Sequence, residues 1–272
     1  MTQLPDGVIV VSGASRGIGR DLVALLLQSG CEVITLARHS GAAQQQPEQD
    51  LDPSAGACAS LMQLQADLGS EAGVADAIVQ LQRVLAGRPV AALVNGAGAV
   101  TPLGPLQQHS SAALLQALCL MAVAPAQLAA ALTPLMPPGG RILNLSSRSA
   151  HETFPGLGVY CMAKHALHAV SQSLRLELAP AIGVAELIPG EVDTAMQAEL
   201  RQPEPEQFAL ASFFRANRSN LIPSPLAALF CQWVLMQTPL EQFNRDAPWF
   251  IYDREMQARW LPPGTAFPFT AP

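Results

Sequence analysis

The sequence predicts an α/β protein built on a single doubly wound parallel sheet with helices on both of its faces. Short apolar runs of strand length recur along the chain, and segments with helical periodicity separate them. The first two runs enclose a glycine-rich turn and an amphipathic helix, which together form a βαβ unit. With 272 residues and 50% hydrophobic content, the chain is long enough to cover both faces of one such sheet. We therefore expect one domain over residues 1–272.

The first βαβ unit also predicts a phosphate-binding turn. It consists of a strand from Val8 to Ser12, a helix from about Ile18 to Gln28 and a strand from Glu32 to Ala37. Gly13, Gly17 and Gly19 would let the turn approach a pyrophosphate, and the helix start would offer it free N–H groups. The alternative is that these glycines only cap a strand–helix turn. Their position directly after a strand favours the binding interpretation, and so a Rossmann-type sheet.

The remaining elements alternate as such a sheet requires. Residues 39–60 are rich in Gln, Ala, Gly and Pro, and we expect a mobile surface loop there in place of a helix. Residues 196–223 contain QPEPEQ and the pair Phe213 and Phe214, which indicates a flexible segment. Further strands are expected near Met62 to Gln65, Ala91 to Asn95, Arg141 to Leu145, Val184 to Ile188 and Trp249 to Tyr252.

Composition limits the classes of partner. The net charge is −6 and no basic run is present, so a nucleic-acid partner is not expected. The five cysteines show no metal-binding spacing, which predicts free thiols in a reducing cytoplasm and no metal site. Residues 89–140 carry no charged side chain, but their longest apolar run, 117–126, is too short to cross a bilayer and contains Pro125. We expect a buried helix there, and the N-terminus lacks the features of a secretory signal.

Ser147, Tyr160 and Lys164 form the most informative constellation. Residues four apart share a helix face, so the ammonium of Lys164 can lie beside the phenol of Tyr160 and lower its pKa. Ser147 would hold a substrate oxygen near that phenol. Taken alone, the tyrosine is more often a core residue and the lysine a solvated charge. Together with the glycine turn, the set predicts a proton donor beside a bound dinucleotide.

In combination, these motifs resemble the short-chain dehydrogenase/reductase family over nearly the whole chain. SGASRGIG at 12–19, NGAG at 95–98 and PGEVDT at 189–194 accompany the Ser, Tyr and Lys set in the family's order. The resemblance implies that Ser147, Tyr160 and Lys164 are catalytic. The cofactor-binding residues that it implies, together with the argument on cofactor choice below, are Gly13, Ser15, Arg16, Gly17, Ile18, Gly19, Arg38, Asp67, Leu68, Asn95, Ala97, Gly98, Tyr160, Lys164, Pro189, Gly190, Val192 and Thr194.

The choice of cofactor can be predicted from the end of the second strand. Family members that prefer NAD typically place an aspartate there, whereas this chain has Ala37 followed by Arg38, with Arg16 in the glycine turn. Two guanidinium groups would bind a 2′-phosphate that an acid would repel. The alternative is that Arg38 is one more solvated charge. We expect NADP(H).

The C-terminal part resembles the sepiapterin reductase and benzil reductase branch, which implies reduction of a ketone of a vicinal dicarbonyl compound. Phe250 stands where pterin-specific members carry an aspartate, and Asp253 lies close to that position. An apolar or aromatic substrate is therefore expected, with residues 196–223 as its lid and with walls from Phe154, Pro155, Phe213 and Phe214. By the same resemblance, the uncharged helix and the helix carrying Tyr160 form a dimer interface, so a homodimer or homotetramer is expected.

Met121 departs from the family pattern, in which an asparagine supports a water that links the lysine to solvent. Methionine cannot make those hydrogen bonds. Two alternatives follow: either a backbone carbonyl and a water take over the role of the asparagine, or turnover is slowed. We favour the first alternative. Three further functions remain open: a pterin reductase, a non-catalytic protein that senses NADP(H), and reduction of an acyl-carrier-protein thioester, which the acidic charge balance disfavours.

Overall fold

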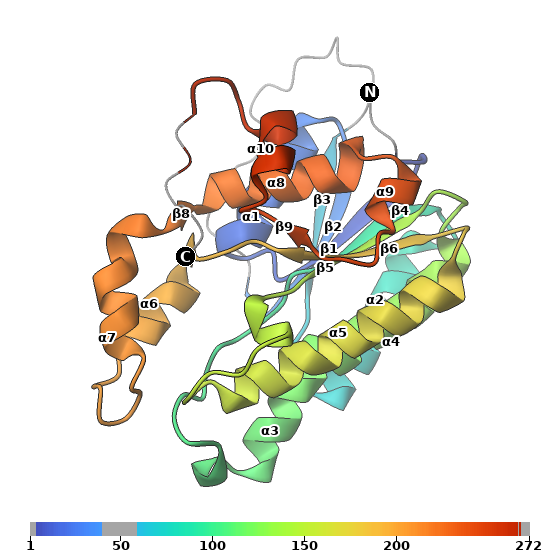
Figure 1. The fold of residues 1–272 in the computed structure, drawn as a ribbon. Helices are drawn as coiled ribbons and strands as arrows, with labels where there is room; N and C mark the ends of the chain where they lie inside the picture. Colours follow the sequence, from blue (N-terminus) through green and yellow to red (C-terminus); the bar gives the residue numbers. More distant parts are fainter. Residues whose placement is uncertain (1–3, 40–58, 266, 268–272) are drawn as a thin grey trace.

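The computed structural model describes residues 4–39, 59–265 and 267. Their centre is a sheet of seven strands in the order β3-β2-β1-β4-β5-β6-β9, and every neighbouring pair is parallel (Figure 1). The strands are β1 (Val8–Ser12), β2 (Glu32–Ala37), β3 (Ser60–Gln65), β4 (Val90–Asn95), β5 (Arg141–Leu145), β6 (Gly183–Ile188) and β9 (Trp249–Phe250). The predicted doubly wound parallel sheet is confirmed.

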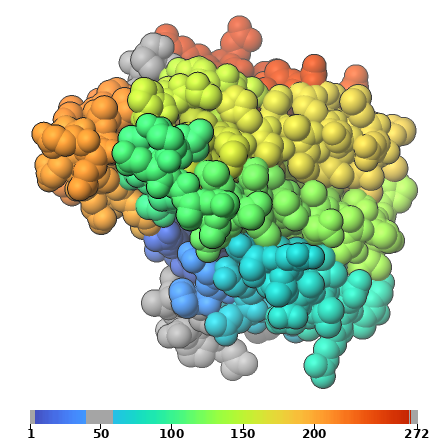
Figure 2. Space-filling model, turned by 90° about the horizontal axis from the view of Figure 1, so that it is seen from below, coloured from blue at the N-terminus to red at the C-terminus, as the bar shows by residue number. Residues whose placement is uncertain are grey.

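Helices cover both faces of the sheet and bury its apolar side chains in two clusters. One cluster includes α1 (Gly17–Gln28), α8 (Ser224–Gln237) and Trp260 of α10 (Arg254–Trp260). The other includes α2 (Glu71–Leu85), α4 (Ala124–Leu132) and the C-terminal part of α5 (Gly158–Leu178). Seen from below, the second layer runs from α2 through the 111–135 helical run to α5 (Figure 2).

The uncharged stretch forms one helical run over Ser111–Leu135. It consists of α3 (Ser111–Leu118), a π-helical turn (Cys119–Val123), α4 and a 3-10 turn (Thr133–Leu135). Within the described part of the chain, this is the helix that is long and apolar enough to cross a membrane, with a mean hydropathy of 1.8. It packs against β4, α2 and α5, as a sheet-covering helix does, but only 39% of its most apolar window is buried, so the expected burial is found in part.

Two expected segments differ in the structure. The 196–223 segment contains α6 (Ala195–Arg201), α7 (Ala211–Ala216) and a 3-10 turn (Asn217–Asn220), and a two-stranded pair, β7 (Val192–Asp193) with β8 (Ile222–Pro223), lies at its base. The last sheet strand ends at Phe250 because the chain then turns into α10, whose N-cap is the side chain of Asp253. Of the expected 39–60 loop, residues 40–58 lie outside the described residues.

The turn between β1 and α1 requires glycine for steric reasons. Gly13 has φ +75°, and a Cβ there would lie 2.5 Å from the Ala97 nitrogen. A Cβ on Gly19 would lie 2.4 Å from the Gly13 carbonyl oxygen. The Ser12 hydroxyl also accepts a hydrogen bond from the Gly96 nitrogen at 3.2 Å. These contacts hold the glycine turn against the end of β4.

A buried arginine at the amino end of β5 holds the C-terminus of α8 against the sheet. Arg141 on β5 is 0% exposed and donates to the carbonyl oxygens of Leu235, at 2.9 Å, and Thr238, at 2.6 Å. These carbonyls belong to the last turn of α8 and the residue after it, where helical partners are missing. Burial lowers the pKa of Arg141 to about 10, so its guanidinium stays charged at neutral pH. Two further short helical elements are the 3-10 turn Arg148–Ala150, between β5 and α5, and α9 (Leu240–Phe243), between α8 and β9.

Candidate active site

Two cavities open at the carboxyl ends of the strands, which is where ligands bind to open parallel sheets. The smaller cavity has a volume of about 330 Å³ and lies over the glycine turn. The larger has a volume of about 970 Å³ and lies between Ser147 and the 196–223 segment. Tyr160 lines both cavities. A group bound in one cavity can therefore meet a group bound in the other at this phenol.

Most of the predicted cofactor residues line the smaller cavity. They come from the β1–α1 turn, the ends of β2 and β4, α5 and the turn after β6. The predicted residues found there are Gly13, Ser15, Arg16, Gly17, Ile18, Gly19, Arg38, Leu68, Ala97, Gly98, Tyr160, Lys164, Pro189 and Thr194. The cradle fits a dinucleotide for two reasons. Its glycines let the backbone approach a bound phosphate closely, and the N-terminus of α1 faces the cavity.

Four predicted cofactor residues lie elsewhere. Gly190 and Val192 line the larger cavity. Asn95 is buried, and its amide donates to the Asn144 side-chain oxygen at 2.8 Å. Asp67 is exposed, and its carboxylate accepts from the Gly69 nitrogen at 3.2 Å. The last two residues therefore shape the strand ends and do not line the cradle.

The three predicted catalytic residues are brought together at the start of α5. Ser147 follows β5, and its hydroxyl shares a hydrogen bond with the Tyr160 phenol. The Ser147 oxygen also accepts from the Ser149 nitrogen at 3.1 Å, which fixes its position. The Lys164 ammonium donates to the Leu145 carbonyl at 2.7 Å and lies 5.7 Å from the centre of the Tyr160 ring.

The expected lowering of the Tyr160 pKa by Lys164 is not found. Burial raises the pKa of Tyr160 to about 12, and the Ser147 hydrogen bond opposes this increase only in part. Burial also lowers the pKa of Lys164 to about 8, because its ammonium is removed from water. Lys164 is directed at a backbone carbonyl instead of the phenol oxygen. The phenol therefore keeps its proton at neutral pH, which is the form required of an acid.

The two arginines expected at a 2′-phosphate have different surroundings. Arg38 is exposed on the wall of the smaller cavity, directly after β2. Arg16 is also in the wall, but its guanidinium forms an ion pair with Glu199 of α6 at 3.2 Å. Because that pair is largely exposed, it costs little to break. Arg38 is thus the more accessible cation.

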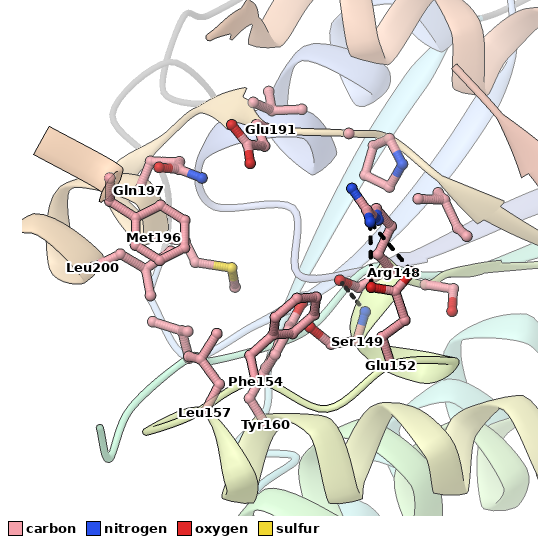
Figure 3. Close-up of a pocket in the computed structure, with 18 of the residues that line it drawn as sticks. Arg148, Ser149, Glu152, Phe154, Leu157, Tyr160, Glu191, Met196, Gln197 and Leu200 are labelled. Atoms are coloured by element: carbon pink, nitrogen blue, oxygen red, sulfur yellow. Dashed lines mark hydrogen bonds and ion pairs between the residues drawn. The ribbon is translucent and has the colours of Figure 1, made fainter. Parts of the chain in front are cut away.

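The larger cavity is predominantly apolar, as expected. Phe154, Leu157, Met196 and Leu200 gather on one side of it, and Tyr160 rises beside Phe154 (Figure 3). Phe213, Phe214 and Phe250 also line it, whereas Pro155 does not. Asp253 caps α10 and is absent from the lining.

Sequence reasoning missed the charged residues of this cavity. Arg148 and Glu152 form an exposed ion pair at 3.2 Å on the opposite side from the apolar group (Figure 3). Burial raises the pKa of Glu191, although a hydrogen bond from Asn217 opposes the increase. The available signal was adjacency, since Arg148 follows Ser147 and Glu191 follows the Pro-Gly turn.

Met121 lies behind the phenol within the π-helical turn. It is 1% exposed and packs with Ala117, Val159, Ala163 and the ring of Tyr160. π-Helical turns inside α-helices are frequent at functional sites. The methionine therefore supports the base of Tyr160 by packing alone.

The comparisons with known proteins agree with this geometry. The short chain dehydrogenase family model matches residues 7–205, and the chain belongs to this family of oxidoreductases. A benzil reductase ((S)-benzoin forming) from Bacillus cereus is 23% identical over 80% of this chain and 88% of its own. A solved short chain dehydrogenase/reductase from Saccharomyces cerevisiae superposes with TM-score 0.75 at 21% identity, covering 94% of this chain and 100% of its own. A short chain dehydrogenase from Burkholderia cenocepacia, solved in complex with NADP, has TM-score 0.68 and 24% identity, covering 91% and 96%.

Proposed function

We propose that this protein is an NADPH-dependent carbonyl reductase that reduces a ketone, with small vicinal dicarbonyl compounds as its substrates. The observation that carries the proposal is the position of Tyr160. Its phenol joins a glycine-rich cradle to an apolar cavity, and it shares a hydrogen bond with Ser147.

In this mechanism the chain's own residues position the carbonyl and protonate it. NADPH, when bound in the smaller cavity, supplies the hydride. Ser147 donates a hydrogen bond to the carbonyl oxygen and so holds the ketone in the larger cavity. Tyr160, which is protonated at neutral pH, gives its proton to that oxygen as the alcohol forms. Lys164 at the cradle wall helps to hold the cofactor ribose.

Preference for NADPH is supported by the charge at the end of β2. Arg38 is exposed at the cradle, and the strand-end position before it, where an acid would repel a 2′-phosphate, is Ala37. Charge-assisted hydrogen bonds contribute roughly 1.5–3 kcal/mol each, so one to two such bonds predict a preference for NADPH over NADH well above tenfold.

The dicarbonyl substrate is supported by the lining of the larger cavity. Phe250 lies in the wall while Asp253 caps α10, so neither supplies an acid that would bind the aminopyrimidine of a pterin. The acid that does line this cavity, Glu191, already accepts a hydrogen bond from Asn217, and it lies at the Pro-Gly turn instead of the Phe250 position. The similarity to a benzil reductase points to the same class of substrate. The helices α6 and α7 line this cavity through Met196, Leu200 and Phe214, and we assign them as its lid.

Steady-state oxidation of NADPH tests the proposal, with benzil and sepiapterin as alternative substrates and Tyr160→Phe as the inactive control. We expect a higher kcat/KM for benzil. A clear preference for sepiapterin would contradict the apolar-cavity argument. Tight NADPH binding without turnover of either substrate, or of simple aldehydes and quinones, would favour the sensing function.

Cofactor preference is tested separately by binding NADPH and NADH to the unmodified protein. The double change Ala37→Asp with Arg38→Ala should reverse the preference. Arg16→Ala is the matched control and should have the smaller effect, because that guanidinium already has Glu199 as a partner. Equal affinity for both dinucleotides would refute the assignment.

A further inference from the structure

Two histidines and a glutamate that the proposed reaction does not use meet beside the larger cavity. His151 follows the 3-10 turn after Ser147, is exposed and lines that cavity. His168 lies on α5, one turn after Lys164. Glu186 lies in the middle of β6 and is 7% exposed. They are brought together because α5 packs against β6 and against the turn that carries His151.

The three side chains present their ligand atoms to one another. One ring nitrogen of each histidine and one carboxylate oxygen of Glu186 all lie within 4.8 Å of each other. Nδ1 of His168 lies 2.5 Å from Oε2 of Glu186. The two imidazole rings meet edge to face, with centroids 4.5 Å apart.

Glu186 supplies a second, independent observation. Its other oxygen, Oε1, is buried and has no hydrogen-bond partner among the described residues. A buried charged oxygen without a partner is costly, and such groups are usually paired or coordinate a metal. An ion pair between His168 and Glu186 accounts for Oε2 alone. It explains neither the free oxygen nor the position of His151.

Two imidazoles and one carboxylate form a ligand set that zinc accepts, with a fourth position left for water or substrate. Zinc bonds of about 2.0–2.1 Å in a tetrahedron place neighbouring ligands about 3.4 Å apart. The longest separation here would have to shorten by roughly 1.4 Å by the same geometry, and the contact between His168 and Glu186 would have to open. His151 can make most of this adjustment, because it is exposed on a turn.

We propose that His151, His168 and Glu186 form a zinc-binding site at the edge of the larger cavity. The open coordination position faces the cavity, because His151 is itself part of the lining. The site is separate from the glycine cradle, whose lining includes none of the three residues. Glu186 is also the charge that raises the pKa of Lys164 against the effect of burial, so zinc bound to it would lower that pKa further.

The test measures zinc binding directly and does not depend on enzyme activity. Protein freed of its affinity tag and dialysed against a chelator is titrated with ZnCl₂ by calorimetry and by competition with a chromophoric chelator. Co²⁺ serves as a spectroscopic probe, since a tetrahedral site gives intense visible absorption. The variants are His151→Ala, His168→Ala and Glu186→Gln. His165→Ala is the matched control, because this exposed histidine lies on the same helix and its ring contacts the Cys161 carbonyl.

We expect one Zn²⁺ per chain in the unmodified protein and in His165→Ala, with affinity at least tenfold weaker in each ligand variant. Outer partners of zinc ligands alone typically account for 10–100-fold. If Glu186→Gln fails to fold, His151→Ala still decides the question, because it changes an exposed side chain. The proposal is overturned if the unmodified protein binds zinc no more tightly than His151→Ala, or if His165→Ala weakens binding equally.

Discussion

Replacing Met121 with asparagine tests how the site works without the amide that the family pattern places there. The side chain is 1% exposed and packs with Ala117, Val159 and Ala163 behind the Tyr160 ring. Burying a methionine of this kind contributes about 1.5–3 kcal/mol. An amide enclosed there without full partners costs about 1–3 kcal/mol more.

The two effects together predict a loss of roughly 2.5–6 kcal/mol in the free energy of unfolding. For a chain of this size, that loss lowers Tm by on the order of 10 °C. Activity should change far less. Lys164 is already held by the Leu145 carbonyl at 2.7 Å, so its position does not depend on residue 121. We therefore expect turnover within a few-fold of the unmodified protein.

Thermal unfolding and kcat for benzil reduction with NADPH measure the two effects separately. Met121→Leu is the matched control, because it conserves volume and apolar character and should cost less than about 1.5 kcal/mol. A strong rise in kcat for Met121→Asn would refute the reasoning. It would show that the methionine interrupts a proton path that a backbone carbonyl and water do not replace.

Three other changes follow from the same contacts. Tyr160→Phe should lower kcat by about 10²–10⁴ with little effect on NADPH affinity, since only the proton donor is removed; retained activity would mean that another group is the acid. Burial lowers the pKa of Lys164 to about 8 and raises that of Tyr160 to about 12. We therefore expect kcat/KM for reduction to fall as pH rises above about 8, because Lys164 loses its charge while the phenol stays protonated. A pH profile that is flat to pH 10 would show that the reaction does not need the charge of Lys164. Arg141→Met should destabilise the fold by about 3–5 kcal/mol, because the carbonyls at the end of α8 lose a buried charged donor. Arg88→Met, which removes a half-exposed ion pair with Glu32, should cost under about 1 kcal/mol. Equal shifts in Tm would contradict the anchoring role of Arg141.

The expected homo-oligomer remains a prediction. Two exposed apolar side chains on α3 and α5 support it. Leu115 on α3 is 65% exposed and Leu176 on α5 is 71% exposed, on the layer seen in Figure 2. In a homo-oligomer that used this face, a second copy of the chain would cover these side chains.

The sheet and the proton donor could be predicted because each depends on local pattern. Buried parallel strands such as β1 and β5 appear as short apolar runs, and the glycine turn identifies the strand–helix junction. The spacing of Tyr160 and Lys164 places them on one helix face. The helices of the 196–223 segment could not be predicted in the same way. α6 and α7 are only seven and six residues long, too short to show a helical period, and their stability comes from packing around Phe208 and Phe214.

The electrostatics of the site depended on burial, which local pattern does not report. Spacing alone predicts that Lys164 lies near Tyr160 and lowers its pKa. The structure turns the ammonium toward the Leu145 carbonyl, and desolvation then dominates both groups. Whether a cation acts on a phenol is decided by which acceptor it reaches, and here the nearest strand end supplies a better one.

Glu186 is the residue at which pattern and structure conflict most clearly. It interrupts GVAELI, an otherwise apolar strand in a position between β5 and β9 where both faces are covered. Glutamate is almost never fully buried unless it is paired, so a glutamate in this buried strand requires a partner from the helices that cover the sheet. The sequence does not identify the partners, because His168 lies 18 residues earlier and His151 lies on a turn outside α5. The packing of α5 on β6 brings them together. A ligand that binds all three side chains best explains why one carboxylate oxygen there has no hydrogen bond within the described part of the chain.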